Sequence, residues 1–131
     1  MTIRRVATTR NALMAALSTA RGQSAQVQLR TGANSSAGGQ GSLLAQLTGN
    51  SSGWATAAVN GVLTSRAITA DSSADATGTV GHYQINTSAG VYLESGLVGA
   101  GQDGVTIDNP TIVMNQRVQM SGNWVDTAAY A

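Results

Sequence analysis

The chain holds few residues that could do acid–base, nucleophilic or redox chemistry. His82 is the only histidine, and cysteine is absent from the 131 residues. A Ser-His-Asp mechanism needs that histidine as the base, within hydrogen-bond reach of a serine and a carboxylate. The alternating pattern around it groups His82 with Val80 and Gln84, and we expect this side of the strand to face solvent or a neighbouring subunit. With one histidine and no thiolate, a zinc site is not expected either.

Two further patterns could bind a nucleotide or a metal ion. Gly99–Gly104 (GAGQDG) has the glycine spacing of a dinucleotide fingerprint, which also requires a strand before it and a helix after it. The residues that follow, Val-Thr-Ile-Asp-Asn-Pro, do not open a helix, so we predict a turn. The pairs Asp71 with Asp75 and Asp103 with Asp108 lack the ligand density and the closing glutamate of an EF-hand loop. We therefore predict no catalytic residue, no metal site and no cofactor, and we do not expect an enzyme.

One helix is expected near the N-terminus, over residues 9–21. Apolar and small side chains recur there at helical spacing, and threonines that can cap the first turn precede them. Gly22 stands where the left-handed residue that ends many helices belongs. The residues that carry the pattern are Thr8 or Thr9, Leu13, Ala16, Leu17 and Ala20. Residues 1–8 are expected to form an arm in front of this helix.

The rest of the chain predicts short strands separated by turns. Val27 and Leu29 alternate with polar neighbours, as in a strand with one buried face. Asn60-Gly61 favours a tight hairpin turn because both positions tolerate positive φ, and it would join strands over 54–59 and 62–69. Further strands are expected over 42–47, 79–86, 91–98, 105–107 and 111–114.

Eight or nine short strands at roughly ten-residue spacing are typical of an all-β fold. We predict a mainly all-β protein, an antiparallel β-sandwich or jelly roll with one short N-terminal helix. It would form a single domain over 9–131 that includes the helix over 9–21, preceded by the arm over 1–8. Its core should be thin, because alanine, glycine, threonine and serine make up about half of the chain and phenylalanine is absent.

The charges are divided unequally along the chain. All seven basic residues are arginines; six of them precede residue 70, where there is no acid, and all six acids follow. This asymmetry favours a basic arm that faces a partner, with Arg4, Arg5 and Arg10 as the candidate contact residues. The alternative is that both halves fold together and the charges neutralise each other across one sheet. The arginines are scattered and not interleaved with aromatic residues, so we expect no direct contact with nucleic acid.

Neither membrane insertion nor export is expected from the sequence. No apolar run approaches the roughly 18 residues that span a bilayer. The segment Asn11–Leu17 is too rich in alanine and too amphipathic for the core of a secretory signal.

Several segments together resemble a family of small virion proteins of tailed bacteriophages. The segments that carry the likeness are the helix Arg10–Leu17 (RNALMAAL), the strand and loop Leu29–Ala33 (LRTGA), the leucine-rich strand Ser42–Leu47, the segment Asp71–Asn86 (DSSADATGTVGHYQIN) and the closing segment Asp108–Ile112 (DNPTI). The likeness covers most of residues 8–125. Its motifs are structural, so they imply a class of role and no catalytic site.

The resemblance implies that the chain is a part of the virion. Members of this family look like capsid decoration (cement) proteins or other accessory head and tail proteins, with β-sandwich or jelly-roll domains. We therefore expect a structural protein that stabilises the head by bridging subunits of its partner, the major capsid protein. We expect the chain to form a dimer or trimer and to be located in the virion, assembled in the host cytoplasm. The alternative is a tail- or fibre-associated virion protein that binds a host-surface glycan.

Overall fold

The protein is mainly β, with antiparallel sheets and one short helix, as the sequence predicts. The computed structural model describes residues 4–33, 39–98, 110–120 and 123–127. Its elements are α1 (Ala7–Arg21), β1 (Gln26–Arg30), β2 (Leu43–Thr48), β3 (Val62–Thr64), β4 (Gly78–Thr79), β5 (His82–Asn86), β6 (Tyr92–Leu97), β7 (Thr111–Ile112) and β8 (Val125–Thr127). The strands expected over 105–107, the Gly99–Gly104 turn, Asp103 and Asp108 lie outside the described residues.

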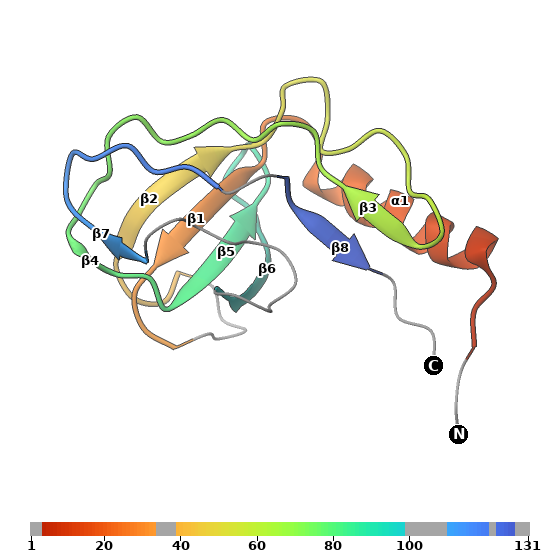
Figure 1. Ribbon diagram of the computed structural model, residues 1–131, viewed down its shortest axis with the longest axis horizontal. Helices are drawn as coiled ribbons and strands as arrows, with labels where there is room; N and C mark the ends of the chain where they lie inside the picture. Colours follow the sequence, from red (N-terminus) through yellow and green to blue (C-terminus); the bar gives the residue numbers. More distant parts are fainter. Residues whose placement is uncertain (1–3, 34–38, 99–109, 121–122, 128–131) are drawn as a thin grey trace.

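A four-stranded antiparallel sheet in the order β2-β1-β5-β6 organises the molecule (Figure 1). In β1, Val27 pairs with Leu47 of β2 and with Ile85 of β5, so these three apolar side chains lie on one face. All three are buried. The alternation that predicted this strand therefore places its apolar side chains correctly.

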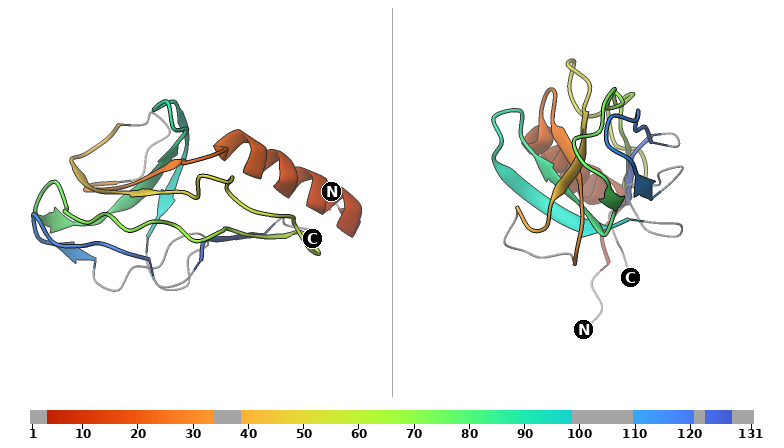
Figure 2. Two further views of the ribbon diagram at one scale, coloured as in Figure 1. Left: turned by 90° about the horizontal axis from the view of Figure 1, so that it is seen from above. Right: turned by 90° about the vertical axis from the view of Figure 1, so that its left-hand side faces the viewer.

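Two short antiparallel ribbons complete the β structure: β4–β7 lies opposite the sheet, and β3–β8 lies beyond the end of the sheet, alongside α1 (Figures 1 and 2). They and their connections contribute Trp54, Leu63, Ile112 and Trp124 to the buried core. Tyr83 of β5 reaches into this core, where its ring meets that of Trp124 edge to face at 4.7 Å between centroids. Gly96 of β6, paired with Tyr83, leaves room for the ring, because a Cβ there would lie 2.7 Å from the Tyr83 ring carbon Cζ.

The opposite face of the sheet is polar but buried, and here the expectation for His82 is wrong. His82 is 1% exposed, and its Nδ1 lies 3.1 Å from the carbonyl oxygen of Gly32. The backbone N–H of Gly39 donates to Oε1 of Gln84 at 2.6 Å, so the backbone at Gly32 and at Gly39 lies against this face. Gln28 and Asn86 are buried beside them and belong to a network of side-chain amides. Strand alternation assigns a residue to a face and carries no information about a loop that covers it.

The helix begins at Ala7, two residues earlier than expected, and Thr8 and Thr9 do not cap it. Val6 is the N-cap residue, with an extended backbone and no side-chain hydrogen bond. Both threonines lie inside the first turn, which the N–H of Arg10 closes on the carbonyl of Val6 at 3.0 Å. The C-terminal end is as predicted: Gly22 has φ +70° and its N–H donates to Ser18. This helix, the only one in the described part of the chain, is too short and too polar to cross a bilayer.

The Asn60-Gly61 turn forms as predicted, but the strand expected before it does not. Asn60 and Gly61 have φ of +51° and +76°, and Val59 and Val62 exchange both backbone hydrogen bonds across the turn. Residues 54–59 make only isolated bridges, at Ala55 and at Val59. Three residues separate these bridges on this side and two on the β3 side, so the extra residue bulges and breaks the ladder.

Candidate interaction surface on the projecting helix

The helix α1 lies mostly outside the core, at one end of the molecule. In Figures 1 and 2 it extends away from the four-stranded sheet, alongside β3. Arg21, in its last turn, is its one buried residue. A helix of this length needs tertiary contacts to persist, so the contacts at its two ends are important for its stability.

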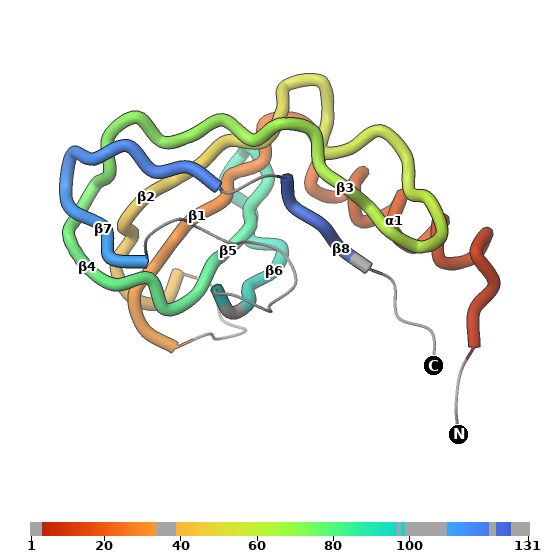
Figure 3. Tube along the Cα trace, viewed as in Figure 1, coloured from red at the N-terminus to blue at the C-terminus, as the bar shows by residue number. Residues whose placement is uncertain are grey.

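The N-terminal end of α1 is held by the hairpin turn between Val59 and Val62 (Figure 3). Asn11 Oδ1 accepts a hydrogen bond from the backbone N–H of Gly61 at 2.7 Å. A guanidinium nitrogen of Arg10 donates to the carbonyl oxygen of Asn60 at 3.3 Å. Glycine is favoured beside Arg10, because Gly61 has φ +76° and a Cβ there would make a tight contact of 3.0 Å with the Arg10 Cβ.

The predicted contact residues Arg4, Arg5 and Arg10 all lie at this end, but they are not equivalent. Arg10 is half-buried and bound to the hairpin turn, so it holds the fold together. Arg4 is exposed and Arg5 half-buried, and neither forms an ion pair with any described residue. Val6 and Val59, 70% and 65% exposed, lie on the same end of the molecule. We call Arg4, Arg5, Val6 and Val59 the basic tip.

The C-terminal end of α1 is fixed by Arg21, which sequence reasoning did not single out. Its side chain is 1% exposed and forms ion pairs with Glu94 of β6 and with Asp126 of β8, the latter at 2.6 Å. The guanidinium carbon lies 4.6 Å from the ring centroid of Trp54 and 5.8 Å from that of Trp124. Burial works to lower the pKa of Arg21, but the hydrogen bonds and charges of Asp126 and Glu94 outweigh it and raise the pKa above its usual value.

Charge neutralisation between the two halves of the chain is therefore real, and in the described part of the chain it is seen at one arginine. Among the described residues, both ion pairs involve Arg21, and both join it to acids of the second half. The signal that could have found it is its position in the last helical turn, next to the Gly22 cap. There a cation meets the negative end of the helix dipole.

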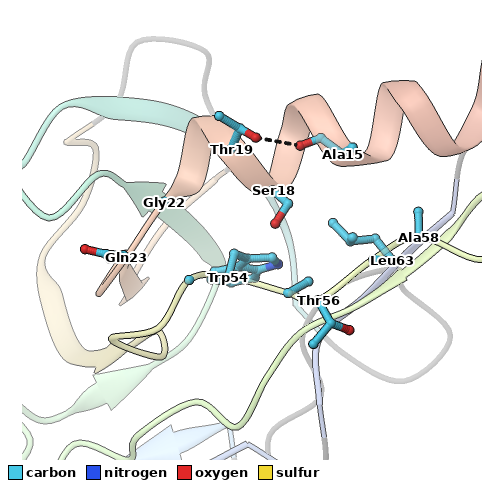
Figure 4. Close-up of a pocket in the computed structure, with 12 residues that line it drawn as sticks. Ala15, Ser18, Thr19, Gly22, Gln23, Trp54, Thr56, Ala58 and Leu63 are labelled. Atoms are coloured by element: carbon cyan, nitrogen blue, oxygen red, sulfur yellow. Dashed lines mark hydrogen bonds between the residues drawn. The ribbon is translucent and has the colours of Figure 1, made fainter.

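A cavity of about 370 Å³ lies between the C-terminal half of α1 and the segment before the hairpin turn (Figure 4). Trp54 and Leu63 form its floor, and Ser18 and Thr56 supply hydroxyl groups. None of the described residues that line it is charged, and Nε1 of Trp54 has no hydrogen-bond partner among the described residues. These residues offer apolar surface and hydroxyl groups, and none of them is a strong base or acid for catalysis.

Within the described ranges, the residues that could do chemistry are not gathered in one place. Both carboxylate oxygens of Asp71 accept backbone N–H groups, from Gln46 and Ser73, so this side chain stabilises the local backbone. No three metal-ligating side chains gather in the part of the chain that the structure describes. Residues 49–53 (GNSSG) have the GxSxG spacing of a hydrolase nucleophile, but they form a turn beyond Thr48. The register of β2, β1 and β5 places His82 at the far end of the sheet from that turn.

The chain matches none of the protein-family models, curated proteins or solved structures with which it was compared. The resemblance to phage virion proteins therefore rests on the sequence motifs alone.

Proposed function

We propose that this protein is a bacteriophage virion structural protein, a capsid decoration (cement) protein that stabilises the head by bridging major capsid subunits. The observation that carries the proposal is the basic tip. It combines arginine that forms no ion pair with a described residue and exposed valine, at the end of a helix that lies outside the core, in a half of the chain without any acid. Arginine and apolar side chains together are typical of protein interfaces.

The shape of the protein agrees with this role. A four-stranded antiparallel sheet with the ribbon β4–β7 opposite it is compatible with a β-sandwich or jelly roll, which we propose as the architecture. A small protein of this kind, with a surface rich in small polar residues, can pack in many copies on a capsid lattice. Binding would also stabilise a thin-cored chain by mass action.

The partner that the basic tip fits is an acidic surface of the major capsid protein. Arg4 and Arg5 would meet carboxylates, and Val6 and Val59 would fill the apolar part of the contact. We propose that the chain acts in the virion, assembled in the host cytoplasm, as a dimer or trimer. In this role it is not an enzyme and needs no cofactor and no direct contact with nucleic acid or membrane.

The alternative, a tail or fibre protein that binds a host-surface glycan, has less support. Sugar-binding modules stack their ligand on exposed aromatic rings, whose apolar faces cover the sugar. Trp54 and Trp124 are both buried, and Tyr83 and Tyr92 are half-buried. Copy number separates the two: hundreds of copies in a particle indicate cement, and a handful indicate a tail or fibre.

The test is occupancy on purified heads that were assembled without this protein. The variant Arg4→Glu/Arg5→Glu reverses both charges of the basic tip, and we expect it to lose most of its binding to the heads. Arg117→Glu, at another exposed arginine, is the matched control and should bind as the wild type does. Unchanged occupancy of the double variant would remove the basic tip from the interface, and absence of wild-type binding would refute the decoration role.

A further inference from the structure

We propose that Asn60 is a deamidation site whose reaction is held in check by Asn11 of α1, so that the docking of the helix sets the rate. Asn60-Gly61 is the only Asn-Gly pair in the sequence. The side chain of Asn60 is exposed and makes no hydrogen bond within the described residues. This proposal goes beyond the decoration role and does not depend on it.

The chemistry needs only the chain and water. The backbone nitrogen of Gly61, after losing its proton, attacks the side-chain carbonyl carbon of Asn60. A carbon–nitrogen bond forms and the bond to the side-chain amide nitrogen breaks. That nitrogen takes up a proton and leaves as ammonia, and a five-membered succinimide remains. Water then opens the ring at either carbonyl, giving aspartate or isoaspartate. Glycine favours the attack because no Cβ hinders its nitrogen.

In the folded protein the attacking nitrogen is occupied. The N–H of Gly61 donates to Asn11 Oδ1 at 2.7 Å, and Gly61 is buried against Arg10. The turn itself is held by both hydrogen bonds between Val59 and Val62, at 2.9 and 3.0 Å. The reaction therefore proceeds from an open state in which the N-terminal end of α1 has separated from the hairpin turn.

The two products act on α1 in opposite ways. Aspartate keeps the backbone and adds a negative charge next to Arg10, which already donates to the carbonyl of residue 60. Isoaspartate adds a methylene group to the main chain inside a two-residue turn. The turn can then no longer keep both Val59–Val62 hydrogen bonds and the contact with Asn11, so the N-terminal half of α1 is released.

The test is the deamidation rate at Asn60, measured by peptide mass spectrometry on the folded chain and on the chain unfolded in urea. We expect the folded wild type to react several-fold more slowly. Asn11→Ala should raise its rate about fivefold, the effect of losing one hydrogen bond of ordinary net strength on the population of the open state. Asn11→Asp keeps an acceptor oxygen and should react no faster than the wild type. Thr8→Ala, on the exposed side of the same helix, should react like the wild type.

Two results would overturn the proposal. One is equal rates for the folded and unfolded wild type; the other is an Asn11→Ala variant that keeps its helix content and reacts no faster. If Asn11→Ala loses the helix, amide hydrogen exchange of Gly61 in the wild type decides. We expect the Gly61 amide to be protected from exchange. An unprotected amide would contradict the proposal that Asn11 slows the reaction.

Discussion

Arg21 is buried where a charge is costly, and its surroundings explain why it is tolerated. Two carboxylates and the faces of two tryptophans surround the guanidinium. Asp126 accepts from both terminal nitrogens, at 2.6 and 3.2 Å, a paired geometry that lysine cannot reproduce. Because its pKa is raised, Arg21 stays charged, and this contribution to stability would be lost only as the pH rises through strongly alkaline values.

Replacing Arg21 with methionine should lower the free energy of unfolding by about 3 kcal/mol, because Glu94 and Asp126 would lose the charge that compensates them. Urea denaturation followed by circular dichroism measures the loss. Removing the stranded charges as well, with Glu94→Gln and Asp126→Asn, should recover part of it. Arg117→Met is the control at an exposed site and should stay within about 0.5 kcal/mol of the wild type. If Arg21→Met changed the free energy of unfolding by as little as Arg117→Met, a structural role for the ion pairs of Arg21 would be contradicted.

The N-terminus of α1 lacks the side chains that usually stabilise the start of a helix. Its N-cap is a valine that makes no side-chain hydrogen bond, and its first turn contains no acid. Arg4, Arg5 and Arg10 place positive charge at the positive end of the helix dipole. The hairpin turn compensates through its hydrogen bonds with Arg10 and Asn11.

Val6→Asp should therefore stabilise the helix by about 1 kcal/mol, because the new carboxylate can accept from free backbone N–H groups of the first turn and favours the dipole. Little burial is lost, since Val6 is mostly exposed. Helix content and denaturation midpoint measure the gain, with Val6→Ala as the control that removes the side chain without adding a cap. The same variant should bind heads less well, since it adds negative charge to the basic tip. A Val6→Asp variant no more stable than Val6→Ala would contradict this account of the helix end.

The elements that local patterns specify were predictable, and those that distant contacts specify were not. Alternation placed Val27 and Leu29, and the Asn60-Gly61 pair placed its turn, because each signal lies within a few residues. The burial of His82, the bulge after Ala55 and the junction of Arg21 with Asp126 depend on segments far away in the sequence. Of the predicted contact residues, Arg10 proved to be part of the fold for the same reason.

The charge asymmetry of the sequence corresponds to a separation of charges in the folded protein. Arg21 is neutralised inside, whereas Arg4 and Arg5 lie at the far end of the helix without an ion pair among the described residues. A contact formed by such exposed charges is screened by salt, because the Debye length falls from about 10 Å at 0.1 M to about 3 Å at 1 M ionic strength.

Occupancy of the wild type on heads should therefore fall as sodium chloride is raised over that range. The residual binding of Arg4→Glu/Arg5→Glu should depend less on salt, and Arg117→Glu should follow the wild type. Quantitative gel analysis of sedimented heads measures all three. Equal salt dependence in the wild type and in the double variant would show that other charges make the contact.

The packing of Arg21 against two tryptophans also affects the spectroscopic properties of the protein. Trp54 and Trp124 are the only tryptophans in the chain, and their ring centroids lie 5.8 Å apart with the planes at 74°. Rings at this separation couple their electronic transitions, so the near-ultraviolet dichroism of the protein carries an exciton contribution from this one place. Withdrawal of the guanidinium from the Trp54 face would change both that contribution and the indole emission. Undocking of α1 can thus be followed in the unlabelled protein, free or bound to a particle that is poor in tryptophan.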